Sequence, residues 1–249
     1  MKIIKIISIS LGVVITSYLS LSCAKTSPEK LAGVNTDFNN KAVVQVFVAA
    51  VNATRNYVYV DANPVTGALL SSGSVFPSQG FGFNVDGGIR AFLVRDTQVI
   101  KTPVTTQVPL SFAENLTAGK HFTIFIYDTI TTPKQLIVQD NIYKPADTGS
   151  CRLRFANFIY NPSAVPNVDV YSFKKASNIF TNIPVTGVTD YISYPSKVTL
   201  DTLYVRETGT LNQLLKVSIS TLTPFRNYTF VYRGSHRATT KSSSLFANF

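Results

Sequence analysis

The chain has 249 residues, and 23 Lys and Arg against 13 Asp and Glu give it a formal net charge of +10. Hydrophobic residues make up 45% and charged residues 14%, which excludes a disordered chain and a charge-rich coiled coil. The two cysteines and two histidines exclude a disulfide scaffold and a cysteine-based zinc site, and they leave almost no ligands for a histidine metal centre. A content of 12 Tyr and 17 Phe, with 13 Gly and 12 Pro, favours β-structure.

Residues 1–22 have the three-part pattern of an export signal. Two lysines precede an apolar run over residues 6–15, and small residues then lead to Cys23. The apolar run is too short to span a bilayer, which takes about 20 such residues. We therefore expect the signal to be removed before Cys23.

The residues just before Cys23, Leu19-Ser20-Leu21-Ser22, resemble the end of a bacterial lipoprotein signal. That resemblance implies that Cys23 is diacylated and becomes the mature N-terminus, although Ser20 stands where a leucine is usual. The alternative is a plain secreted protein with an unpaired terminal cysteine, which an oxidising compartment disfavours. We expect lipidation, which gives a stable membrane anchor. Residues 23–41, polar and without periodicity, are predicted to be a tether.

Residues 42–147 are predicted to form a first antiparallel β-sandwich of Ig-like or transthyretin-like class. Short runs with alternating polarity indicate strands, and no stretch of the mature chain has a convincing helical period. Turn signals separate the runs, and Asp86-Gly87-Gly88 is predicted to be a hairpin turn. The predicted strands cover 42–51, 56–61, 78–85, 88–96, 107–113, 121–128 and 135–139.

The sequence then repeats with a period of about 110 residues, which is the size of a whole domain. Residues 93–97 match 204–208 at an offset of 111, and residues 116–123 match 222–229 at an offset of 106. A third match, at an offset of 110, pairs 56–60 with 166–170. Residues 150–249 are therefore predicted to form a second β-sandwich, with the boundary at Asp147-Thr148-Gly149.

The second copy opens with a run, Cys151-Arg152-Leu153-Arg154-Phe155, that predicts a half-buried strand with both arginines on one face. Further on, a loop rich in Pro and Ala leads into Val168-Asp169-Val170-Tyr171. That stretch, with Leu116-Thr117-Ala118-Gly119-Lys120 in the first copy, is similar to the bacterial exported family called domain of unknown function 4397. The resemblance implies an exported, often tandem and often lipidated β-sandwich, and it implies no catalytic residue. The first copy departs from the pattern, because Tyr59 replaces the Asp.

Catalytic candidates are few. His121 and His236 are the histidines available as general bases. Asn227 stands at the position of the second copy that corresponds to His121, so the fold does not require a histidine there, and His236 has no acidic neighbour in sequence. Cys151 is predicted to be a buried, inert thiol because it falls on the apolar side of its strand. The acids lie at predicted strand ends and turns, where Asp commonly bonds the backbone, at Asp61, Asp86, Asp128, Asp140, Asp147, Asp190 and Asp201. We expect no enzyme, cofactor or metal site.

Aromatic side chains are the best indication of binding. Tyr57 and Tyr59 alternate with two valines, so one face of that strand carries both tyrosines, which are candidate ligand-binding residues. The alternative is that they are core or cross-strand pairing residues. From Thr208 to Phe249 there is no acid, and such a basic field suits anionic partners such as acidic glycans or lipid phosphates. The alternative, which we favour, is a mildly basic exported surface without a specific anionic partner.

The sequence thus predicts a non-catalytic lipoprotein of the bacterial cell envelope, attached to the outer membrane through Cys23. Its expected role is a binding or adhesion module for a glycan or a protein, without nucleic acid. The alternative is a structural or assembly subunit that pairs through edge strands or through the apolar end, residues 245–249.

Overall fold

A computed structural model describes residues 38–78, 80–96, 107–196, 200–220, 222–237 and 239–248. Residues from Phe38 onward form one compact unit. The predicted export signal, Cys23 and the tether up to residue 37 lie outside the described residues. In the part of the chain that the structure describes, no helix is long and apolar enough to cross a membrane.

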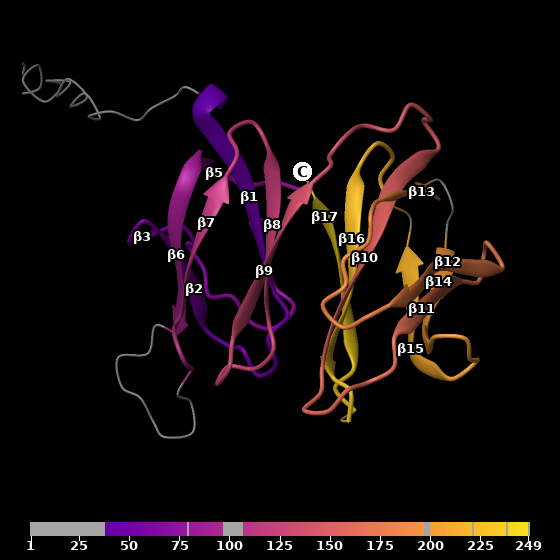
Figure 1. The fold of residues 1–249 in the computed structure, drawn as a ribbon. Helices are drawn as coiled ribbons and strands as arrows, with labels where there is room; N and C mark the ends of the chain where they lie inside the picture. The colour runs from indigo at the N-terminus through magenta and orange to yellow at the C-terminus, as the bar shows by residue number, and fades with distance from the viewer. Residues whose placement is uncertain are drawn as a thin grey trace, which may run out of the picture. The chain divides into compact units, whose positions relative to one another are not determined.

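The fold is all-β, as the sequence predicts, and the helical element among the described residues is one turn of 3-10 helix, η1 (Phe38–Asn40). The first half of the unit is a sandwich of two sheets, which we call the first inner and first outer sheets (Figure 1). The first inner sheet contains β1 (Lys41–Val48), β4 (Val75–Phe76), β5 (Phe83–Asp86), β8 (His121–Tyr127) and β9 (Lys134–Asp140). The first outer sheet contains β2 (Asn56–Val60), β3 (Asn63–Pro64), β6 (Gly88–Asp96) and β7 (Leu110–Leu116).

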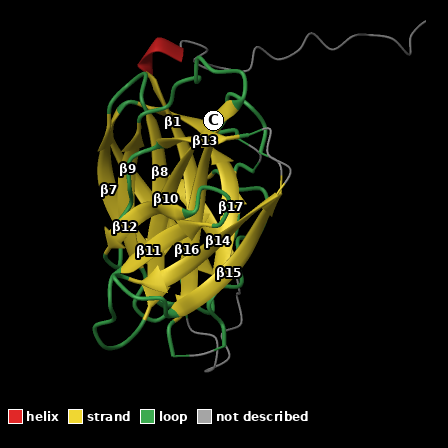
Figure 2. Ribbon diagram, turned by 90° about the vertical axis from the view of Figure 1, so that its right-hand side faces the viewer, coloured by secondary structure: helices red, strands yellow, loops and turns green. Residues whose placement is uncertain are grey.

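The second half repeats this arrangement with a second inner and a second outer sheet, and strands dominate both halves when the unit is turned (Figure 2). The second inner sheet contains β10 (Ser150–Tyr160), β13 (Ile192–Pro195), β16 (Asn227–Ser235) and β17 (Ser242–Asn248). The second outer sheet contains β11 (Val168–Ser172), β12 (Ser177–Ile183), β14 (Leu200–Glu207) and β15 (Gln213–Ser220). The outer sheets have matching strand orders, β3-β2-β6-β7 and β12-β11-β14-β15.

The sheets are antiparallel except for one pair in each inner sheet, which the sequence did not predict. β1 pairs with β8 in parallel, and β10 pairs with β16 in parallel. Each of the seven predicted runs of the first half overlaps a strand, and the two-residue strands β3 and β4 were missed.

The predicted hairpin at Asp86-Gly87-Gly88 is wrong. β5 pairs with β1 in the inner sheet, whereas β6 pairs with β2 and β7 in the outer sheet. The chain therefore crosses from one sheet to the other here. A side chain at position 87 would lie 3.3 Å from the carbonyl oxygen of Asn40, and Gly88 has φ +94°, so both glycines suit a tight crossover.

The repeat also needs one correction. Val58 pairs with Val94, and Val170 pairs with Val205, so Val58 corresponds to Val170 at an offset of 112, not 110. Tyr59 consequently corresponds to Tyr171 rather than to Asp169. The sequence could not show this offset, because shifting one Val-rich alternating run by two residues against the other leaves the same pattern of polar and apolar residues. The strand pairing determines which residues correspond.

Each half has its own apolar core, and a third apolar cluster joins the two inner sheets. Phe47 stacks on Phe246 with ring centroids 5.1 Å apart, and Phe125 stacks on Phe158 at 4.7 Å. Burying an aromatic side chain of this size stabilises the folded chain by about 1.5–3 kcal/mol. The four sheets therefore lie in layers with the inner sheets face to face (Figure 1).

Arg154 lies at the centre of a buried polar network between the inner sheets. Its guanidinium donates to Asp140 Oδ1 at 2.5 Å, to Thr123 Oγ1 at 3.1 Å and to Thr229 Oγ1 at 2.8 Å. The exposed fractions of the Arg154 and Asp140 side chains are 1% and 0%. Burial raises the pKa of the Asp140 carboxyl, and Arg154 and Thr123 oppose the rise by stabilising its charged form.

Amide side chains extend this network across the same interface. Asn248 Nδ2 donates to Gln45 Oε1 at 3.1 Å and to Thr123 Oγ1 at 3.2 Å, and Gln45 Nε2 donates to the carbonyl oxygen of Ala247 at 3.1 Å. β10 is thus buried on both faces, not half-buried as predicted, because the first half packs against its arginine face. The interface holds the two halves in a fixed relation.

Candidate functional site

Tyr57 and Tyr59 lie on the solvent side of the first outer sheet. They are half-buried, whereas the alternating residues Val58 and Val60 belong to the core of the first half. Arg95 on the neighbouring strand β6 lies over the Tyr59 ring at 4.7 Å and donates to its hydroxyl at 3.3 Å. The two candidate residues therefore share a face, and Tyr59 also makes a cross-strand contact.

The corresponding face of the second outer sheet carries a richer arrangement, a row of four side chains across four strands. Tyr171 on β11 pairs with Asn178 on β12 and with Tyr204 on β14, and Tyr204 pairs with Lys216 on β15. Because paired residues in a sheet point to the same side, the four side chains line up on one face. We call this set the tyrosine row: Asn178, Tyr171, Tyr204 and Lys216.

Arg206, two residues after Tyr204 on β14, contacts both rings of the tyrosine row. Its guanidinium lies 4.2 Å from the centroid of Tyr171 and 5.2 Å from that of Tyr204, and the two rings are 6.2 Å apart. The amine of Lys216 approaches the Tyr204 ring at 5.9 Å from the other side. Cations at such distances stabilise aromatic rings through the ring quadrupole, so the rings are held in place before any ligand arrives.

Asp169 fixes the loops at one end of this face. Its carboxylate accepts hydrogen bonds from Asn182 N at 2.7 Å, Thr208 Oγ1 at 3.0 Å, Gly209 N at 3.2 Å and Asn178 Nδ2 at 3.2 Å. Asp169, the acid of the Val-Asp-Val-Tyr run, therefore stabilises the local structure. It connects the β11–β12 and β14–β15 regions and orients one end of the tyrosine row.

Sequence reasoning missed Tyr171, Tyr204 and Arg206 as site residues. Residues 168–171 served to identify the family resemblance, and residues 204–206 served to identify the repeat. The sequence alone did not indicate that the two segments contribute side chains to the same face of one sheet. The signal was present, because β11 and β14 both alternate an aromatic or polar residue with a buried aliphatic one. Only the pairing register puts Tyr171 beside Tyr204.

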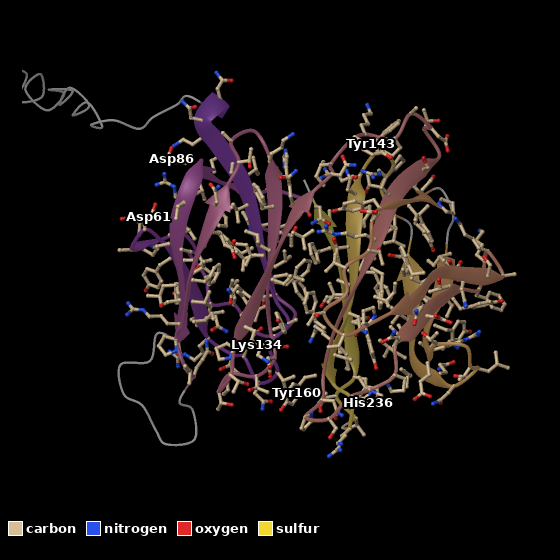
Figure 3. The ribbon with its side chains drawn as sticks, in the orientation of Figure 1. Asp61, Asp86, Lys134, Tyr143, Tyr160 and His236 are labelled. Carbon is tan, nitrogen blue, oxygen red and sulfur yellow. The ribbon has the colours of Figure 1, made fainter. Side chains whose placement is uncertain are left out.

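The two histidines do not form a catalytic arrangement with the labelled acids. Figure 3 shows Asp61 and Asp86 on the first half and His236 on the second, well apart. His121 begins β8 and is half-buried, and burial lowers its pKa while the charge of Asp140 opposes that change. Asp140 itself accepts hydrogen bonds from Arg154 and Thr123.

Asp61 and Asp86 are held in their charged forms. Asp61 accepts a hydrogen bond from Ala91 N at 3.0 Å and pairs with Arg90 at 3.0 Å, which lowers its pKa. Asp86 pairs with Lys41 at 2.5 Å, which lowers its pKa too. A glycoside hydrolase needs one carboxyl with a raised pKa as general acid, and neither of these has it.

Cys151 is buried, and burial raises its pKa to about 11. Such a thiol is a poor nucleophile at neutral pH. Among the residues that the structure describes, no three His, Cys, Asp or Glu side chains gather as metal ligands. The apolar C-terminal segment is built into the fold, because Leu245 packs on the second core and Phe246 packs between the halves, while Phe249 lies outside the described residues.

No protein-family model matches the chain, and no curated protein matches it. The resemblance to the domain of unknown function 4397 family therefore stays a prediction.

Three solved structures show a distant likeness. The chain is 13% identical to an alpha-glucan-binding streptococcal virulence factor, over 84% of this chain and 97% of that one, with a TM-score of 0.26. It is 9% identical to the Bacillus anthracis TIE protein, over 79% and 34% of the two chains, with a TM-score of 0.24. It is 11% identical to SpuA, a multi-modular glycogen-degrading pneumococcal virulence factor, over 84% and 22%, with a TM-score of 0.26. Because the TM-scores are low, we draw neither fold nor function from these likenesses.

Proposed function

We propose that the protein is a non-catalytic binding module of the bacterial cell envelope, anchored to the outer membrane through a lipidated Cys23. It binds a glycan on the outward face of the second outer sheet. The observation that carries this proposal is the tyrosine row with Arg206 over its rings, an aromatic pair flanked by an amide and a cation on the sheet.

The chemistry of this face favours a glycan over a protein. A sugar ring presents an apolar face of C–H groups and a rim of hydroxyls, which suits exposed tyrosine rings flanked by polar groups. The centre of a protein interface is depleted in lysine and serine, although tyrosine and arginine are enriched there. This face carries Lys216 and Ser218, with Asn178 and Thr202 on the same side.

A glycan array with the mature chain tests the proposal, with Tyr204→Ala as the probing variant. Removing a stacking ring at the centre of a site costs about 2 kcal/mol, so we expect affinity for the best glycan to fall about thirtyfold. Leu211→Ala serves as the matched control, because Leu211 is 85% exposed and lies outside the tyrosine row. An array without any binding, or equal binding by wild type and Tyr204→Ala, contradicts the proposal.

A protein partner is the other outcome of the same experiment series. If the array is empty and an envelope pull-down recovers one protein that Tyr204→Ala no longer recovers, the face binds protein and the glycan proposal fails. The assembly alternative was motivated by the apolar end of the chain, where Leu245 packs on the second core and Phe246 packs between the halves. Its other route is pairing through edge strands.

A further inference from the structure

A pocket with a volume of about 250 Å³ opens at the seam between the two halves, away from the tyrosine row. We call it the seam pocket. Phe158 and Ile159, each 2% exposed, line it together with the half-buried rings of Tyr127 and Tyr160. Figure 3 labels Lys134 and Tyr160 next to each other at this end, one from each half.

A second cavity of about 300 Å³ lies beside the seam pocket, and Ile159, Asn161 and Val185 line both. The second cavity follows the loop over residues 161–165, the Pro- and Ala-rich loop noted in the sequence. That loop has no part in the tyrosine row, so its composition is unexplained by the proposed function.

One polar atom in the wall of the seam pocket lacks a partner. Asn161 Nδ2 donates to the carbonyl oxygen of Ser163 at 2.8 Å, which fixes the orientation of the amide. Asn161 Oδ1 is then buried, and no hydrogen-bond donor of the described residues reaches it. A buried acceptor without a donor costs stability, so a hydrogen bond donated by a ligand group would relieve that cost.

Two residues that line the seam pocket have strained backbones. Asp128 has φ 75° and Thr186 has φ 65°, values that a β-branched residue such as threonine rarely adopts. Asp128 is held by Lys134 at 2.7 Å and by Thr132 Oγ1 at 3.1 Å. Strain of this kind collects at ligand sites, because the surrounding structure is built to maintain a particular shape there.

The charges at the rim cancel. Asp128 and Lys134 pair with each other, so the site offers a neutral ligand aromatic walls, an apolar floor and an unused acceptor. Pockets for drug-sized ligands measure about 300–1,000 Å³, so this one admits a single ring. We propose that the seam pocket binds one neutral pyranose ring, whose hydroxyl donates to Asn161 Oδ1 while its C–H face packs on a tyrosine.

This second site does not depend on the tyrosine row, and the test separates the two. Saturation-transfer NMR measures binding of methyl α- and β-pyranosides of glucose, galactose, mannose and N-acetylglucosamine to the mature chain. Val185→Trp fills the pocket from its wall, where Val185 is 37% exposed. Val108→Trp is the matched control, because Val108 is 46% exposed and does not line the pocket.

We expect at least one pyranoside to bind, with affinity more than tenfold weaker in Val185→Trp and unchanged in Val108→Trp and Tyr204→Ala. Asn161→Ala is expected to weaken binding about three- to tenfold, since one neutral hydrogen bond is lost. The melting temperature of each variant shows that it is folded.

Absence of binding to wild type overturns the inference, because Asn161 Oδ1 then meets only water. Full binding by a folded Val185→Trp variant overturns it too. Binding that is lost in Tyr204→Ala and kept in Val185→Trp places the ring on the tyrosine row, which refutes the seam pocket and supports the proposed function.

Discussion

Replacing Arg154 with methionine removes the guanidinium that forms a buried ion pair with the Asp140 carboxylate. Methionine has a similar length and keeps the apolar contacts of the stem. Breaking a buried pair by removing one partner costs about 3–5 kcal/mol, because an uncompensated charge stays buried. The hydroxyl of Thr123, which donates to Asp140 at 2.6 Å, stays in place in this variant but carries no charge.

Urea unfolding followed by circular dichroism measures this loss. Arg90→Met is the matched control, because the ion pair between Arg90 and Asp61 is exposed to solvent. The exposed fraction of the side chain is 28% for Arg90 and 41% for Asp61. An exposed pair of this kind is worth less than about 1 kcal/mol.

The double variant Arg154→Met/Asp140→Leu is expected to recover most of the loss, because two apolar groups replace the ion pair. The penalty of Arg154→Met is also expected to shrink as pH falls, because a protonated Asp140 no longer needs the cation. A loss in Arg154→Met below about 1 kcal/mol, equal to that of the exposed control, refutes the assignment of Arg154 as the centre of the interface.

Three further outcomes follow from the structure. Burial lowers the pKa of His121 below its usual 6.5, because the folded protein favours the neutral imidazole. The stability that this neutral form provides is present above pH 6.5 and is lost as the pH falls through the lowered pKa. His121→Asn is therefore expected to flatten the curve of unfolding free energy against pH below 6.5, and an unchanged curve contradicts this. Gly73→Ala places a Cβ against the Arg233 guanidinium at φ +91°, and it is expected to destabilise the protein by more than about 1 kcal/mol. Gly119→Ala has similar φ and nothing within 4 Å, so thermal unfolding of both variants separates contact from strain, and equal losses argue against the Arg233 contact. A thiol reagent is expected to label Cys151 only after denaturation, and rapid labelling of the native chain disproves its burial.

The fold class was predictable because alternation is a local property. In β2 the buried valines alternate with half-buried tyrosines, and the sequence shows that period directly. The parallel pairs β1/β8 and β10/β16 were not predictable, because they join strands that lie far apart in the sequence. The crossover between sheets at Gly87 was not predictable either, because Asp86-Gly87-Gly88 is equally typical of a hairpin turn.

The interface between the halves was beyond sequence reasoning for a different reason. Arg152 and Arg154 were correctly placed on one face of a strand, and a strand with a polar face normally exposes it to water. Here that face is covered by the other half, and the acid and hydroxyl groups that satisfy Arg154 come from β8, β9 and β16. Because a buried charge must be paired, the burial of Arg154 could be predicted only if its partners on other strands were known.

The candidate site was found in part. Tyr57 and Tyr59 were assigned to one face by their spacing, whereas the tyrosine row is assembled by register between four strands. The unpartnered acceptor at Asn161 depends on a loop conformation that no periodicity describes.

The most direct test of the central claim is to map a bound glycan on the protein by backbone NMR, with the oligosaccharide that an array selects. The account predicts that the shifted amides cluster on β11, β14 and β15 around Tyr171 and Tyr204, with a smaller set at the seam pocket for ligands with a free terminal ring. Shifts confined to any other face, with the amides around Tyr204 unmoved at saturation, contradict it.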